Sequence, residues 1–102
     1  MNRLEVLQSM VEQNPTDAFS RYGLAMEFKN GGRLEEAIDQ FVTLLEHNPS
    51  YTSGYFQAAQ TLEKLGRTDD ARGLYRRGIE AASAAGDDHA AAEMQAALDI
   101  LR

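Results

Sequence analysis

The sequence lacks cysteine and has only two prolines. Without cysteine, a disulfide framework and thiol chemistry are excluded. No run approaches the roughly 20 apolar residues that a membrane-spanning helix needs. Residues 1–12 also lack the basic-then-apolar order of a secretory signal. We therefore expect a cytoplasmic protein that does not associate with membranes.

Basic residues are scarce as well. There are 10 lysines and arginines against 16 aspartates and glutamates, which gives a net charge of −6. A nucleic-acid binder needs a positive face to displace counterions, so this balance disfavours nucleic-acid binding. The apolar fraction of 43% is ordinary for a folded domain. A chain of 102 residues is the length of one domain with a modest core.

The sequence repeats itself at a spacing of 34 residues. Asn14-Pro15 recurs 34 positions later as Asn48-Pro49, and Gly32-Arg33 recurs as Gly66-Arg67. The same spacing relates five further pairs of similar residues: Ala37 and Ala71, Phe41 and Tyr75, Leu45 and Ile79, Tyr22 and Phe56, and Phe28 and Leu62. A fixed period of this size indicates a stacked array of repeats rather than a fold with a single core.

Apolar residues at helical spacing predict six helices and no strand. We expect the first helix at about 3–13, the second up to about Asn30, the third at about 34–47, the fourth from about Tyr51 to Gly66, the fifth up to the break at Gly86, and the sixth at about 89–101. Thr16 or Asp17 should cap the second helix, and Thr68 or Asp69 the fifth. Gly78 lies inside the predicted fifth helix, and we interpret it as a point where a neighbouring helix packs closely.

The repeated residues resemble the tetratricopeptide repeat, a helix–turn–helix unit of 34 residues. The match is good in the second helix of each unit, which reads Ala37-x3-Phe41 and Ala71-x3-Tyr75. It is looser in the first helix, and Ser83 stands where the second unit would have its proline.

This resemblance implies an all-α, right-handed superhelical array of antiparallel helix hairpins. We expect one domain, residues 1–102, divided into a half repeat at 1–14, full repeats at 18–51 and 52–85, and a closing helix at 86–102 that caps the array. Gly32 and Gly66 should form the turn inside each hairpin. Ala37 and Ala71 should lie where the two helices of a hairpin approach closely.

No residues form a catalytic constellation, so we expect a protein without enzymatic activity, cofactor or metal. The only histidines, His47 and His89, are far apart in the sequence. Asp87-Asp88-His89 is better explained by helix capping than by metal binding, because adjacent side chains on a helix point in different directions.

In tetratricopeptide proteins the first helix of each unit lines a concave groove. The resemblance therefore implies ten candidate groove residues: Phe19, Tyr22, Met26, Lys29 and Asn30 in the first unit, and Ser53, Phe56, Gln60, Glu63 and Lys64 in the second. Family members that bind chaperone tails hold a carboxylate with lysines and asparagines, but Tyr22, Met26 and Gln57 occupy the corresponding positions here. The sequence leaves open whether these side chains line a groove or are core residues packed against the closing helix.

The sequence thus predicts a protein–protein interaction module that binds a peptide or helical segment. Two other classes compete with it. A structural protein could dimerise through an exposed edge helix, and a helical repeat could bind RNA. The negative net charge makes RNA binding a poor candidate.

We predict that Ala37→Trp and Ala71→Trp each lower the free energy of unfolding by about 1–3 kcal/mol, because overpacking forces close helices apart. Urea unfolding measures the change. Arg33→Trp is the control and should have a far smaller effect. If either alanine variant unfolds together with the wild type, the proposed register of the repeat is wrong.

Overall fold

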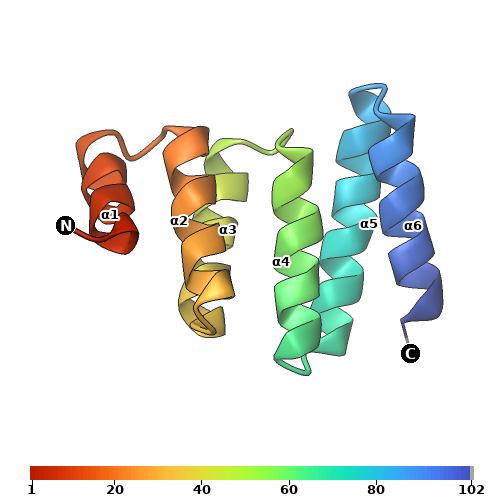
Figure 1. Ribbon diagram of the computed structural model, residues 1–102. Coiled ribbons are helices and arrows are strands. Elements are labelled where there is room, and N and C mark those ends of the chain that lie inside the picture. The colour runs from red at the N-terminus through yellow and green to blue at the C-terminus, as the bar shows by residue number, and fades with distance from the viewer. Residues whose placement is uncertain (102) are drawn as a thin grey trace.

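The computed structural model describes residues 1–101, and residue 102, the last of the predicted closing segment, lies outside the described part. The described residues form six helices and no strand, as predicted. The helices are α1 (Arg3–Gln13), α2 (Ala18–Asn30), α3 (Leu34–His47), α4 (Thr52–Lys64), α5 (Thr68–Ala84) and α6 (Asp88–Ile100). They follow one another along a curved array, with α1 at one end and α6 at the other (Figure 1).

The helices form two layers. Helices α2 and α4 stand in front of α3 and α5, and each front helix packs against the one that follows it in the chain (Figure 1). Helix α6 packs against α5 at the end of the array. Each helix therefore touches mainly its neighbours in sequence, which is the contact pattern of a repeat array.

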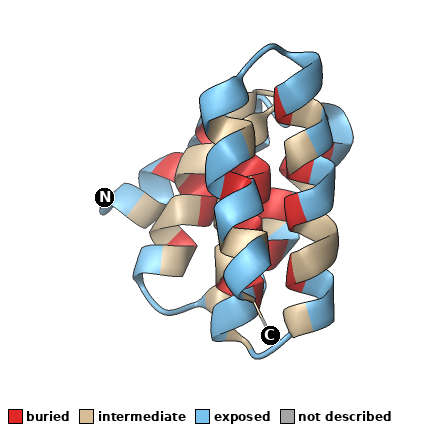
Figure 2. Cartoon of the chain, turned by 90° about the vertical axis from the view of Figure 1, so that its right-hand side faces the viewer, coloured by how far each residue is buried: buried red, intermediate tan, exposed pale blue. Residues whose placement is uncertain are grey.

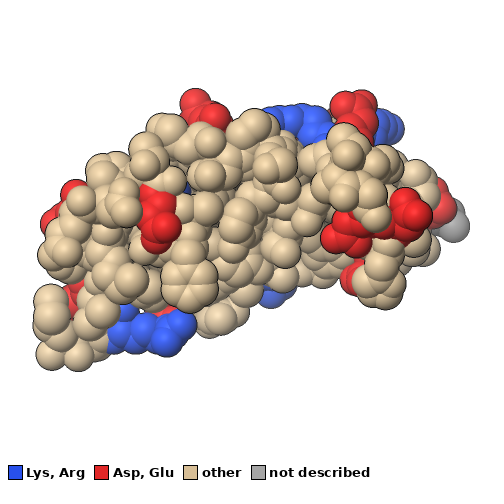
Figure 3. Space-filling model, turned by 90° about the horizontal axis from the view of Figure 1, so that it is seen from above, with Lys and Arg blue, Asp and Glu red and all other residues tan. Residues whose placement is uncertain are grey.

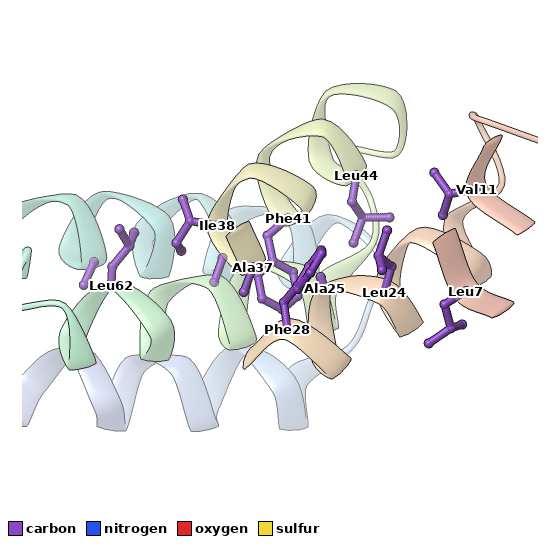
Figure 4. Close-up of a cluster of buried hydrophobic side chains, with 12 residues drawn as sticks. Leu7, Val11, Leu24, Ala25, Phe28, Ala37, Ile38, Phe41, Leu44 and Leu62 are labelled. Atoms are coloured by element: carbon purple, nitrogen blue, oxygen red, sulfur yellow. The ribbon is translucent and has the colours of Figure 1, made fainter. Parts of the chain in front are cut away.

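Buried residues gather between the layers, while the outward faces of the helices are exposed (Figure 2). One core cluster joins α1 to α5, and in it Ala25, Phe28, Ala37 and Phe41 point toward one another (Figure 4). A second cluster joins α3, α4, α5 and α6. Ala37 and Ala71 are completely buried, as their predicted role in close helix packing requires.

The turns inside the hairpins form at the predicted glycines. Gly32 and Gly66 have φ angles of +79° and +76°, in the left-handed region that other residues rarely adopt. Asp17 caps α2, since its carboxylate accepts a hydrogen bond from the Ser20 amide. The predicted cap of α5 is wrong. Arg67 directly follows the left-handed glycine and takes the N-cap position, so Thr68 is already the first helical residue.

The missing proline of the second unit lengthens α5. Pro49 disfavours helical backbone at Asn48, and α3 ends at His47. In the second unit Ser83 replaces the proline, and α5 continues to Ala84, with 17 residues against 14 in α3. Helix α6 consequently begins 36 residues after the start of α4. It takes the place of the first helix of a third unit, shifted by two residues from the repeat.

The two glycines inside α5 should respond in opposite ways to alanine. A Cβ at Gly78 would lie 2.5 Å from Met94 Sδ and 2.7 Å from Tyr55 Cβ. Gly78→Ala should therefore lower the free energy of unfolding by about 1–3 kcal/mol. A Cβ at Gly73 would meet nothing within 4 Å, so Gly73→Ala should raise it by about 0.5–1 kcal/mol. Thermal unfolding compares the pair, and shifts of the same sign would contradict the proposed contact at α6.

Candidate functional site

Helices α2, α4 and α6 share one side of the array, which we call the groove face. Three hollows lie on it, and the ten predicted groove residues all line at least one of them. The hollow between α1 and α2, of about 300 Å³, is lined by Arg3, Leu7, Phe19, Tyr22, Gly23, Met26, Glu27 and Asn30. The central hollow, of about 260 Å³, is lined by Tyr22, Thr52, Ser53, Phe56, Gln57, Asp87, Ala90, Glu93 and Met94. The lysine hollow, of about 400 Å³, is lined by Lys29, Gln60, Glu63 and Lys64.

Two aromatic side chains of the groove face, Tyr22 and Phe56, pack against other rings of the core. The ring of Tyr22 packs against those of Phe41 and Tyr51, with centroids 6.2 and 5.3 Å away. Phe56 packs edge to face on Tyr75 at 6.1 Å. Tyr22 and Phe56 are therefore half-buried, with one part of each ring in the core and another part lining a hollow.

The predicted residues do not form one continuous site. Tyr22 joins the first two hollows, whereas Phe19 and Phe56 line different ones. Phe19 has 75% of its surface exposed and packs least of all the aromatic residues on this face. Helix α6 stands at the end of the array, beside α5 (Figure 1), and three of its residues line the central hollow.

The lysine hollow is organised by neutral hydrogen-bond acceptors. Lys29 Nζ, on α2, donates to Gln57 Oε1 at 2.5 Å and to Gln60 Oε1 at 3.3 Å, both on α4. Partial burial, and then repulsion from Lys64, lower the pKa of the Lys29 ammonium. The carboxylate of Glu63 accepts a hydrogen bond from the hydroxyl of Tyr75, and burial followed by this contact raises the pKa of the Tyr75 phenol.

The sequence did not predict that α6 helps to form the central hollow. Asp87, Ala90, Glu93 and Met94 line one side of it, whereas the sequence left open whether the closing helix packs against the groove residues. Ser83, which replaces the expected proline, was the available signal that the repeat shifts before α6. Acidic side chains lie at this end of the array (Figure 3).

Within residues 1–101 no three or more histidine and carboxylate side chains come together as metal ligands would. Over the same range, none of the helices combines the length and hydrophobicity required to cross a bilayer. His47 lies near the Thr43 carbonyl, and His89 pairs with Glu93, each within its own helix.

The fold and the repeated glycines, alanines and prolines define a helical repeat protein. A family model described as tetratricopeptide repeat matches residues 1–82. The chain therefore belongs to the tetratricopeptide repeat family.

The known proteins that are similar to this chain include the following three. An uncharacterised protein of Methanocaldococcus jannaschii is 33% identical over 69 residues, which cover 68% of this chain and 80% of the relative. The solution structure of a tetratricopeptide repeat domain protein from Salinibacter ruber is 36% identical, with a TM-score of 0.78, and the match covers 83% of this chain and 86% of that one. PcrH, solved in complex with the chaperone binding region of PopD, has a TM-score of 0.90 at 21% identity, with coverage of 96% and 74%.

The pair of lysines in the lysine hollow predicts how a substitution changes the pKa of Lys29. Lys64→Gln removes one of the two causes that lower the pKa of Lys29, so this pKa should rise. It should stay below the ordinary lysine value, because the burial of Lys29 is unchanged. The ¹³Cε chemical shift of Lys29, followed as a function of pH, measures the effect. An unchanged pKa would show that the two ammonium groups do not interact.

Proposed function

We propose that this chain is a protein-interaction module that binds a peptide or helical segment of another protein on its groove face, without catalysis. One observation carries the proposal. Half-exposed Tyr22 and Phe56 are packed against the buried rings of Phe41 and Tyr75, and exposed Phe19 lines a hollow together with Tyr22. Rigid aromatic side chains that are ordered before binding lose little entropy on contact and are typical anchors of protein interfaces.

The hollows suit such a ligand in size and chemistry. Each has a volume of about 260 to 400 Å³, which is enough for one or two side chains rather than a large cofactor. Apolar Tyr22, Met26 and Phe56 alternate with polar groups such as Ser53 and Gln60, as in grooves that hold an extended or helical segment.

The comparisons support the same class of function. PcrH shares the fold and was solved together with a segment of another protein. Its low identity to this chain means that the likeness supports the fold and the general mode of use, not a shared partner. The net charge of −6 continues to favour a protein partner over a nucleic acid, and a cytoplasmic location stays an expectation from the sequence.

Self-association is the second candidate. Val6 and Met10 on α1 and Ile100 on α6 are large apolar side chains exposed near the two ends of the array. Exposed apolar surface favours association, so a homodimer through α1 or α6 would cover them. Light scattering on the chain alone separates the candidates, because a dimer forms without any added ligand.

The proposed function predicts that Phe19→Ser weakens peptide binding. Peptides of about 12 residues selected from a random library should lose about tenfold in affinity for this variant, since an aromatic side chain buried in the interface contributes on the order of 1.5–3 kcal/mol. Calorimetric titration measures the affinity. The control is Val42→Ser, which removes another apolar side chain, 47% exposed and on α3 rather than on the groove face.

Amide chemical-shift mapping locates the bound peptide. Shifts on α2, α4 and the facing side of α6 are expected. If the selected peptides instead shift residues of α3 and α5 and lose affinity with Val42→Ser, the groove face is not the binding site.

A further inference from the structure

The chain has only two lysines, and both line the same hollow. Lys29 and Lys64 lie 35 positions apart, in the last turns of α2 and α4. Both line the lysine hollow of the groove face, together with Gln60 and Glu63. Two cations are thus brought together in a protein whose net charge is −6.

Neither lysine forms an ion pair in the described part of the chain, although several arginines do. Arg3, Arg33, Arg67 and Arg72 each pair with a carboxylate within 2.9 Å. Lys29 reaches across to α4 and is held by the amide oxygens of Gln57 and Gln60. These neutral acceptors orient the ammonium without neutralising its charge.

Glu63 supplies the carboxylate in the lining of this hollow, and it is hydrogen-bonded to a residue outside that lining. Its oxygen accepts the hydrogen bond of the buried Tyr75 hydroxyl, and it forms no ion pair with either lysine within the 1–101 range. The hydrogen bond from Tyr75 therefore engages the Glu63 carboxylate, which is the hollow's own anion.

Helix ends explain only part of this arrangement. A lysine in the last turn of a helix interacts favourably with the partial negative charge there, and this accounts for each lysine separately. It does not account for two unpaired ammonium groups in one hollow, where burial and then the repulsion from Lys64 lower the pKa of Lys29. An anion bound between them would relieve that repulsion.

We propose that Lys29 and Lys64 form an anion-binding subsite of the groove face, which takes the carboxylate of an acidic residue in the bound peptide. This inference rests on the proposed function. The position of the subsite differs from the family's carboxylate clamp, whose corresponding residues here are Tyr22, Met26 and Gln57. Asp87 and Glu93 line the central hollow and repel a carboxylate there, so the subsite also favours one direction of the peptide along the face.

The subsite can be tested without knowing the partner. Because the chain has two lysines, a sample labelled with ¹³C-lysine gives two resolved side-chain environments. Glutamate blocked as the N-acetyl amide serves as the probe, and the equally blocked glutamine serves as its neutral counterpart. Blocked glutamate should shift the ε signals of both lysines and raise the pKa of Lys29, whereas blocked glutamine should do neither.

Two variants with equal loss of charge give the matched comparison. Lys64→Gln should abolish the response of Lys29 to blocked glutamate. Arg76→Gln, at an exposed position on α5, should leave it unchanged. Glu63→Gln, which removes the negative charge of the hollow, should strengthen the response. Equal responses to the two probes, or a response that survives Lys64→Gln, would overturn the subsite.

Library peptides separate this inference from the proposed function. A selected peptide that contains an acidic residue should bind the Lys64→Gln variant about threefold or more weakly, and replacing that acidic residue by glutamine should remove the difference. Peptides that bind the groove face equally well with and without Lys64 would refute the subsite alone. Peptides that bind only α3 and α5 would refute the proposed function, and the blocked-glutamate titration would still decide whether the lysines bind an anion.

Discussion

Close packing of helices at small buried residues sets the spacing of the whole array. Ala25 and Ala37 in the first hairpin, and Ala59 and Ala71 in the second, are completely buried. Gly78 performs the same role at the end of the array, where no side chain could fit between α5 and its neighbours Met94 and Tyr55. Because each helix packs mainly on its sequence neighbours, these contacts fix how far apart α2, α4 and α6 stand. The hollows of the groove face follow from that spacing.

The turns between units depend on a second repeated interaction. Arg21 Nη2 donates to the carbonyl of Pro15 at 2.9 Å, and 34 residues later the Tyr55 hydroxyl donates to the carbonyl of Pro49 at 2.7 Å. Different side chains thus tie the same point of the first helix to the proline turn before it. The turn before α6 has no proline, and α5 runs on to Ala84 there. We attribute the shift of α6 along the array to the replacement of the repeat's proline by Ser83.

The parts of the structure that the sequence predicted depend on local signals. Helix periodicity and the glycines at 32 and 66 determine the six helices and their turns, because those residues act within a few positions of themselves. The predicted start of α5 was wrong. Thr68 and Asp69 are good capping residues, but Arg67, which follows the left-handed Gly66, takes the cap position, so both lie inside the helix. The four residues that line the lysine hollow were all predicted as groove residues, but the contacts among them could not be predicted. Lys29 and Lys64 were separate candidates, and only the fold shows that Lys29 bonds to glutamines of α4 rather than to a carboxylate.

Under this proposal, the net charge of the protein would not predict the charge of the group that it binds. A value of −6 implies a surface that repels acidic partners. At physiological ionic strength, however, charges on the surface are screened over about 8 Å. A carboxylate inside the lysine hollow interacts chiefly with the two ammonium groups that line it, and most of the acidic residues lie elsewhere on the array. In the proposed complex, the overall charge would slow the approach of an acidic peptide, whereas Lys29 and Lys64 would decide where its carboxylate binds. The rate of approach and the place of binding would then depend on different charges of the same molecule.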